Sequence, residues 1–193
     1  GLCGALAIND PSLVDRATYI WERGTNRQAV LNGLADKYTW VEVGGSFYPS
    51  ELQAAFLLAQ LETLEENLVQ RKALYDSYLE GLAALKSEGL VHYIEPTDYP
   101  GNNYHAFVAQ FESSERCNRV REYLVARDVH AYIGYVPLHS SPVGLAMGYK
   151  PEDLPITEEY ATRVLRMPLH NKLTPDDIQY VCTLTKEASS NHA

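Results

Sequence analysis

The chain has 193 residues, which is enough for one domain or for two small ones. Its hydrophobic content of 46% and charged content of 21% are typical of a globular protein with an ordinary core. The formal net charge is -9 and the chain has no basic run, so we expect neither a nucleic-acid partner nor a membrane partner, because both need clustered lysine and arginine.

The three cysteines, Cys3, Cys117 and Cys182, are far apart and odd in number. They fit neither a disulfide framework nor a zinc pair, and a reducing cytoplasm is the predicted setting. The chain opens on Gly1 rather than on methionine, and an apolar run follows at once. We therefore expect a piece of a longer protein.

The first apolar run, at residues 4–8, predicts a short buried strand. Asp10 and Pro11 then supply the N-cap and the first residue of a helix, and Gly24 is expected to end that helix. A strand followed by a helix is half of an α/β unit. Residues 24–49 lack a clear period and are predicted to be loop, and loops of this length are often functional.

A helical pattern extends from Ser50 to Lys86. Ser50 and Gln53 have the S-x-x-Q spacing of a capping box. An unbroken helix of this length would extend more than about 50 Å, which exceeds one small domain. We therefore expect a bend or a domain junction in the polar stretch at residues 62–71. The predicted domains are residues 1–65 and residues 66–193.

After Gly89 the pattern changes to short strands and helices, which is typical of an α+β domain. The predicted fold class is therefore α/β at the start of the chain and α+β in its second part. The expected strands are residues 91–94, 105–111 and 129–133, and the expected helix starts are Ser113 or Ser114, Thr157 and Thr174.

The histidines do not form a metal-ligand pattern. His92, His105 and His130 lie on different predicted strands, and His139 and His170 lie near prolines. No pair has the i,i+4 spacing of a helical metal site, and no cysteine is close enough in sequence to contribute. We expect no metal centre.

Two segments are candidates for ligand contacts. Gly44 and Gly45 precede the helix start at Ser50, where glycines let the backbone approach an anion and free N–H groups bind it. Tyr135 and His139 follow a predicted strand, a position that often lines sites in α/β folds. A plain helix entry and an ordinary loop explain the same patterns, so both interpretations stay open at this stage.

Several segments, taken together, resemble the signature segments of one family, the DegT/DnrJ/EryC1/StrS sugar aminotransferases, which use pyridoxal phosphate. The resemblance extends from Gly4 to about Lys186. The segments are RGTNR at 23–27, DKYTW at 36–40, GGSFYPSELQAAF at 44–56, YVPLH at 135–139 and MPLHNKLT at 167–174.

This resemblance implies a fold and a set of site residues. The fold would be the C-terminal end of the large domain plus the small domain of a fold-type I aminotransferase. Ser46 would contact the cofactor phosphate of the neighbouring subunit, and Tyr135 and His139 would face the nucleotide-sugar substrate. Arg27 and Lys37 are suited to holding a substrate phosphate. A turn serine, a structural tyrosine and solvated loop charges are the alternatives.

The resemblance also places the central chemical group outside this chain. In the family a lysine just before the segment G-E-G-G-A-L holds pyridoxal phosphate covalently, and the present chain begins after that lysine. Leu2 replaces the glutamate of that segment, and Gly134 stands where the family usually has histidine. We therefore assign no catalytic residue here. We expect pyridoxal phosphate in the longer protein and no covalent cofactor in this chain.

The implied reaction moves an amino group from glutamate to a dTDP-4-keto-6-deoxyhexose in surface-polysaccharide biosynthesis. The chain alone would be inactive. A different class of function stays open, namely a non-catalytic remnant that only folds and self-associates. The apolar positions Leu52, Ala55, Phe56 and Ala59 would be bare without a covering partner, so we expect a homodimer or a higher oligomer.

Overall fold

A computed structural model describes residues 4–93 and 101–190 of the chain. Leu2, Cys3 and Ile94, which the sequence analysis used, lie outside the described residues. The contacts divide the chain into two units, Gly1–Leu64 and Glu65–Ala193. Each unit is described by itself below.

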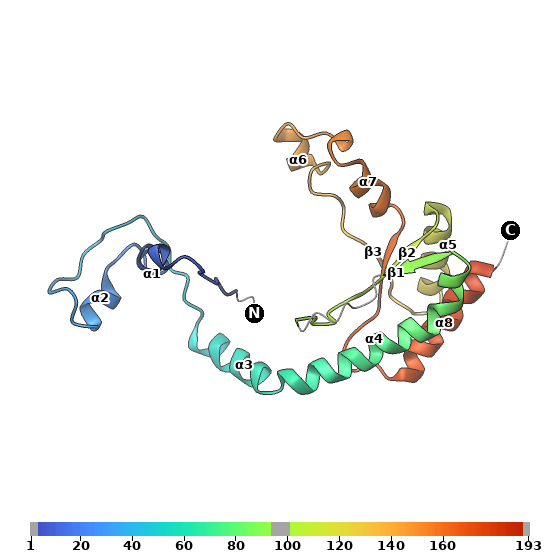
Figure 1. Cartoon of the computed structure of the whole chain (residues 1–193), viewed down its shortest axis with the longest axis horizontal. Coiled ribbons are helices and arrows are strands. Elements are labelled where there is room, and N and C mark those ends of the chain that lie inside the picture. Colours follow the sequence, from blue (N-terminus) through green and yellow to red (C-terminus); the bar gives the residue numbers. More distant parts are fainter. Residues whose placement is uncertain (1–3, 94–100, 191–193) are drawn as a thin grey trace. The chain divides into compact units, whose positions relative to one another are not determined.

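The first unit is built from short helices joined by loops (Figure 1). Asp10 begins the first of them, because its carboxylate accepts a hydrogen bond from the Ser12 backbone N–H at 2.9 Å. The predicted strand at residues 4–8 is wrong, since the structure has no strand there and Leu6 is 78% exposed. The helical elements of this unit are η1 (Pro11–Leu13), α1 (Val14–Trp21), α2 (Arg27–Leu31) and α3 (Glu51–Glu62).

The end of α1 pairs with the glycine-rich segment that precedes α3. The Gly45 N–H donates to the Ile20 carbonyl at 3.0 Å, and the Arg23 N–H donates to the Gly45 carbonyl at 3.1 Å. A Cβ at Gly44 would lie 2.6 Å from the Ile20 carbonyl oxygen, so only glycine permits this approach. The segment at residues 24–49 that was predicted to be loop also contains the helix α2.

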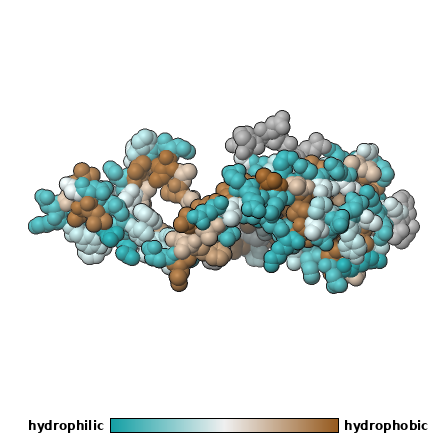
Figure 2. Space-filling view, turned by 90° about the horizontal axis from the view of Figure 1, so that it is seen from below, coloured by the Kyte–Doolittle hydropathy of each residue, from teal (hydrophilic) through white to brown (hydrophobic). Residues whose placement is uncertain are grey.

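The buried positions among residues 4–64 are Glu22, Gly24 and Thr25. Apolar side chains of this unit are instead exposed, as Figure 2 shows by its hydrophobic surface. Leu52 and Phe56 of α3 are 84% and 68% exposed. This unit therefore has a small polar interior and no apolar core among its described residues.

The long helix predicted from Ser50 is two helices, α3 and α4 (Leu64–Ser87). The capping box at its start is confirmed, because Ser50 and Gln53 make both reciprocal bonds. The helix is interrupted at Thr63, whose hydroxyl donates to the Ala59 and Gln60 carbonyls at 3.4 and 3.3 Å. Such back-bonding by threonine competes with regular helix geometry.

The second unit contains an antiparallel four-stranded sheet in the order β1-β2-β4-β3 among the described residues. Buried and half-buried positions alternate along β2, which is the pattern of a strand with one face on a core. Helices α4, α5 and α8 pack with the sheet (Figure 1). The bounds are β1 (Val91–Tyr93), β2 (Phe107–Phe111), α5 (Ser114–Val125), β3 (Tyr132–Ile133), β4 (Val164–Met167) and α8 (Pro175–Ser190).

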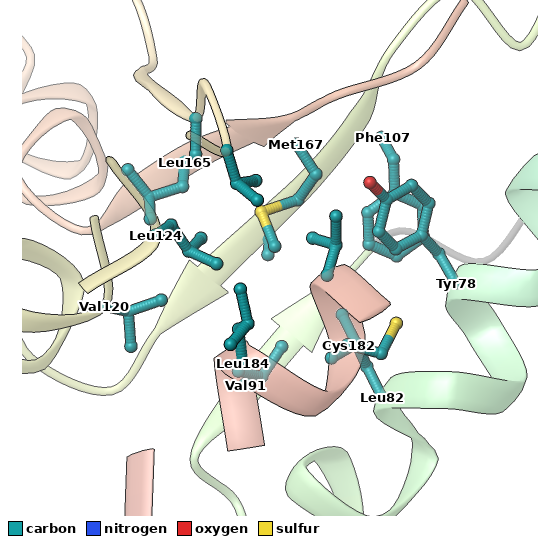
Figure 3. Close-up of a cluster of buried hydrophobic side chains, with 14 of the residues drawn as sticks. Tyr78, Leu82, Val91, Phe107, Val120, Leu124, Leu165, Met167, Cys182 and Leu184 are labelled. Atoms are coloured by element: carbon teal, nitrogen blue, oxygen red, sulfur yellow. The ribbon is translucent and has the colours of Figure 1, made fainter. Parts of the chain in front are cut away.

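The core of the second unit lies between these helices and the sheet (Figure 3). Tyr78 of α4 stacks on Phe107 of β2 with ring centroids 4.5 Å apart, and its hydroxyl donates to the Pro168 carbonyl at 2.7 Å. Leu82 and Leu165 belong to the same core and are fully buried. Burial of each such side chain contributes about 1.5–3 kcal/mol to the free energy of unfolding. This core therefore stabilises the sheet and the polar residues at its edges.

The connection from β3 to β4 forms an arm that extends from the sheet (Figure 1). Its first helix begins where Ser141 accepts a hydrogen bond from the Gly144 N–H at 3.2 Å and Pro142 occupies the first turn. The elements of the arm are α6 (Pro142–Ala146), η2 (Pro151–Asp153) and α7 (Pro155–Ala161). Within the described ranges, the helices are all too short or too polar to cross a bilayer.

Candidate functional site

The first unit has a buried carboxylate at its centre. Glu22 follows α1 and is 2% exposed. Its Oε1 accepts hydrogen bonds from Gln28 Nε2 at 2.8 Å and from the hydroxyl of Tyr48, and Nη1 of Arg27 lies 3.7 Å away. Oε2 of Glu22 is buried without a hydrogen-bond partner among the described residues. A buried carboxylate needs such donors because its desolvation is costly.

The predicted cofactor residue Ser46 lies next to this cluster. Its backbone forms an antiparallel bridge with Glu22, while the residue itself is exposed. Arg27 has a half-exposed side chain, so its guanidinium can meet both Glu22 and solvent. The structure thus brings the backbone of Ser46 and the guanidinium of Arg27 to one buried residue, Glu22.

The other predicted phosphate residue of this unit, Lys37, is placed by its backbone. Its carbonyl accepts a hydrogen bond from Asn26 Nδ2 at 2.9 Å, and Asn26 Oδ1 accepts from the Thr39 N–H at 2.9 Å. Lys37 is an exposed residue. Asn26 therefore holds the loop that contains Lys37 against the start of α2, whose first residue is Arg27.

In the second unit, Tyr135 follows β3 and is 80% exposed. Its hydroxyl accepts a hydrogen bond from Arg166 Nη1 at 2.7 Å, and the guanidinium carbon lies 5.1 Å from the ring centroid. Arg166 comes from β4, where it pairs with Tyr132. The result is an exposed phenol with a cation beside it, which suits contacts with an anionic or hydroxyl-bearing ligand.

His139 has a different environment although it is close to Tyr135 in sequence. It is 8% exposed, and its Nε2 lies 3.2 Å from Glu158 Oε1 and 3.4 Å from the Pro151 carbonyl oxygen. Both neighbours belong to the arm between β3 and β4. The imidazole therefore joins the start of the arm to η2 and α7.

The second unit also has an open cavity of about 700 Å³. Arg166 lines it together with the imidazoles of His105, His130 and His170, and neither Tyr135 nor His139 does. Among the described residues, no group of three or more histidine, cysteine, aspartate or glutamate side chains is placed to hold a metal ion. Burial raises the pKa of the Cys117 thiol to about 11 and that of Cys182 to about 12, so both are inert at neutral pH.

The sequence analysis missed Glu22, Arg166 and Glu158. Glu22 could have been found, because an acidic residue at a helix C-terminus opposes the helix dipole unless tertiary partners hold it. Arg166 interrupts the apolar run Val164–Met167, which is a second signal. No local sequence pattern pointed to Glu158, because its contact is with His139, 19 positions away.

Comparisons with solved structures define the class of fold. DesV from S. venezuelae, solved in complex with a ketimine intermediate, matches with a TM-score of 0.78 and 27% identity, over 97% of this chain and 47% of that one. An aminotransferase from Psychrobacter cryohalolentis matches with a TM-score of 0.79 over 94% of this chain and 50% of that one, at 18% identity. The chain therefore has the fold of about half of an aminotransferase chain.

The sequence comparison then identifies the family. Residues 1–186 match the DegT/DnrJ/EryC1/StrS aminotransferase family, and the chain belongs to this family. The dTDP-3-amino-3,4,6-trideoxy-alpha-D-glucose transaminase of Streptomyces venezuelae is 30% identical over 86% of this chain and 40% of that protein. The UDP-2-acetamido-2-deoxy-3-oxo-D-glucuronate aminotransferase of Pseudomonas aeruginosa is 29% identical over 93% of this chain and 45% of that protein. The chain thus spans less than half the length of these relatives.

Proposed function

We propose that the protein carrying this chain transfers an amino group from glutamate to a nucleotide-linked keto sugar in the cytoplasm. The observation that carries the proposal is the family match over residues 1–186, together with relatives whose names specify transaminases of nucleotide sugars. In this proposal the present chain supplies substrate and cofactor contacts, and a lysine elsewhere in the protein supplies the covalent attachment.

Pyridoxal phosphate is the cofactor that the family implies, and the residues of the first unit suit its phosphate. Ser46 is an exposed residue with a hydroxyl donor, on a segment whose glycines, Gly44 and Gly45, let the backbone pack against the end of α1. When bound, the cofactor supplies the electron sink that amino transfer needs. Ser46 would donate one hydrogen bond to the phosphate, in the neighbouring subunit of a homodimer.

We assign substrate contacts to four residues. Arg27 and Lys37 carry cationic side chains that suit the diphosphate of a nucleotide sugar, and a guanidinium can bind phosphate through two parallel hydrogen bonds. Tyr135, with Arg166 beside it, suits the hydroxyl groups of the sugar. His139 would contact the substrate from its buried position at the start of the arm.

The particular substrate that we propose is a dTDP-4-keto-6-deoxyhexose, used for surface polysaccharide. The two relatives above act, by name, on a dTDP-linked and a UDP-linked sugar, so they support a nucleotide sugar as the class. The test is to purify the protein as its source makes it and to incubate it with pyridoxal phosphate, glutamate and dTDP-4-keto-6-deoxyglucose. Formation of the amino sugar, seen by mass spectrometry, is the expected result.

Two control substrates and the isolated chain as a control make this test specific. The corresponding 3-keto sugar and a UDP-linked 4-keto sugar should react at least about tenfold more slowly, the factor that 1.4 kcal/mol of discrimination supplies. The isolated 193-residue chain should form no adduct with pyridoxal phosphate that borohydride fixes to a single lysine. Amination by none of the substrates would reject the proposal for the intact protein.

The exposed apolar surface of α3 favours a second candidate function, which is self-association without catalysis. Leu52, Phe56, Leu58 and Leu61 are each more than half exposed, and soluble monomers rarely leave such a patch bare. This candidate predicts that the intact protein forms stable oligomers but neither retains pyridoxal phosphate nor aminates any sugar in the assay above.

A further inference from the structure

We infer that Glu22 is a positioning residue, which sets the orientation of the Arg27 guanidinium and of the Ser46 segment for an anionic ligand. The inference rests on the proposed function, in which these two residues contact phosphate groups. It adds a residue that touches neither ligand and acts through Arg27, Tyr48 and the backbone of Ser46.

The first argument is the burial of the Glu22 carboxylate. Its side chain is 1% exposed, although the apolar side chains around it in the same unit face solvent. Placing a carboxylate at one of the few buried positions of a small polar unit is costly unless donors surround it. We therefore explain the burial of the Glu22 carboxylate by the groups that it holds in place.

The second argument is the set of segments that meet at Glu22 Oε1. Gln28 and Arg27 come from α2, Tyr48 comes from the entry to α3, and Glu22 itself ends α1. The Tyr48 ring also packs on Trp21, with centroids 4.2 Å apart. One carboxylate thus joins three segments that are up to 26 positions apart in the sequence.

The third argument is the geometry of Arg27. Its Nη1 lies 3.7 Å from Oε1, which is beyond a direct hydrogen bond but within the range of an ion pair. About half of the Arg27 side chain is exposed, so a ligand can reach it from solvent. This arrangement orients the guanidinium while leaving it able to bind an anion with its remaining donors.

The fourth argument is the backbone of Ser46, which bridges to Glu22 directly. The Phe47 N–H donates to the Trp21 carbonyl at 3.4 Å, and the Arg23 N–H donates to the Gly45 carbonyl at 3.1 Å. The Ser46 hydroxyl therefore depends on the same strand pairing that Glu22 anchors through Tyr48. A change at Glu22 should reach both predicted phosphate contacts together.

The test measures how fast phenylglyoxal modifies Arg27 in the intact protein, read by peptide mass spectrometry. The Glu22 carboxylate lies 3.7 Å from the guanidinium of Arg27 and pairs with it, so this contact should slow attack of the reagent on that group. Glu22→Gln keeps the shape and removes the charge, so modification of Arg27 should become about tenfold faster, which corresponds to 1.4 kcal/mol. Binding of inorganic pyrophosphate, measured by calorimetry, should weaken in the same variant.

Three further variants make the result specific. Glu42→Gln is the matched control, because Glu42 pairs with Arg16 at 2.8 Å on the exposed side of the same unit, and it should leave the Arg27 rate unchanged. Glu22→Asp keeps the charge and should restore part of the protection. Tyr48→Phe removes one donor from Oε1, so the carboxylate should hold Arg27 more strongly and slow its modification.

The two proposals fail in different ways. An unchanged Arg27 rate in folded Glu22→Gln protein overturns the positioning role, even when the enzyme aminates sugars normally. A protein that aminates no sugar rejects the proposed function, whereas the Arg27 rates still measure the role of Glu22. If Glu22→Gln protein does not fold, Tyr48→Phe decides, and an unchanged Arg27 rate in that variant overturns the inference.

Discussion

Gly81 of α4 and Cys182 of α8 lie in direct contact within the core of the second unit. A Cβ at Gly81 would lie 2.5 Å from Sγ and 2.9 Å from Cβ of Cys182. Real Cβ atoms do not approach other atoms so closely, so the absence of a side chain at Gly81 lets the two helices pack. This contact is a direct link between the long helix and the C-terminal helix.

Gly81→Ala should therefore destabilise the second unit by about 1–3 kcal/mol, the usual cost of overpacking a core. The opposite expectation follows from helix propensity alone, which favours alanine over glycine by about 1 kcal/mol. Urea denaturation of Gly81→Ala, Cys182→Ala and the double variant measures the coupling between the two positions. A Gly81→Ala variant that is more stable than the wild type, with no coupling to Cys182, would contradict the packing described here.

The buried thiols predict a loss of stability in alkaline solution. The pKa of Cys117 is raised to about 11 and that of Cys182 to about 12 by burial, from an ordinary value of 9.0. Above pH 9 the unfolded chain releases these protons first, so the free energy of unfolding falls as pH rises, until pH exceeds the folded pKa values. Urea midpoints between pH 8 and pH 11 should decrease less steeply in Cys117→Ala protein, and parallel slopes would show that this thiol is not shielded.

Exposed apolar residues of α3 predict self-association of the chain. Replacing Leu52 and Phe56 by glutamate should shift the sedimentation of the protein toward the monomer, because each substitution removes an apolar contact and adds charge. Leu31→Glu is a suitable control, since Leu31 is also exposed, at 62%, but lies on α2. A wild-type protein that sediments as a monomer at micromolar concentration would rule out this use of α3.

Ser46 and His139 should give different kinetic defects in the intact protein. Loss of one hydrogen bond to a charged group costs about 1.5–3 kcal/mol, so Ser46→Ala should weaken retention of pyridoxal phosphate by roughly ten- to a hundredfold. His139→Ala should raise the KM for the nucleotide sugar and leave cofactor affinity unchanged. Glu158→Gln is informative here, because it removes the partner of His139 but not the imidazole.

Equal defects in Ser46→Ala and His139→Ala proteins would show that the assigned roles are wrong. A Glu158→Gln variant that reproduces the whole effect of His139→Ala would place the role of His139 in holding the arm rather than in touching the sugar. A smaller effect of Glu158→Gln would support direct contact between the imidazole of His139 and the sugar.

Features that depend on a few adjacent residues were predictable from the sequence. The capping box at Ser50 and the helix starts at Asp10 and Thr174 need only local hydrogen bonds, and the structure has all three. The break at Thr63 also lies in the stretch where a bend was expected. Family membership was predictable too, because short ordered motifs carry it.

Features that depend on distant partners were not predictable. An apolar run such as residues 4–8 is a strand only when another strand pairs with it, and the described chain provides none. Glu22 accepts hydrogen bonds from Gln28 and Tyr48, which are six and 26 positions away, and no local sequence pattern indicates that these side chains meet. Arg166 reaches Tyr135 because β3 and β4 pair in one particular register.

The polar interior of the first unit has a thermodynamic consequence. The heat capacity of unfolding comes mainly from newly hydrated apolar surface, and this unit already exposes most of its large apolar side chains to water. Its opening would therefore change the heat capacity and the denaturant slope very little. Calorimetry and urea titration would report almost entirely on the second unit, whereas amide hydrogen exchange at residues 22–48 would follow the segment that carries Glu22, Arg27 and Ser46.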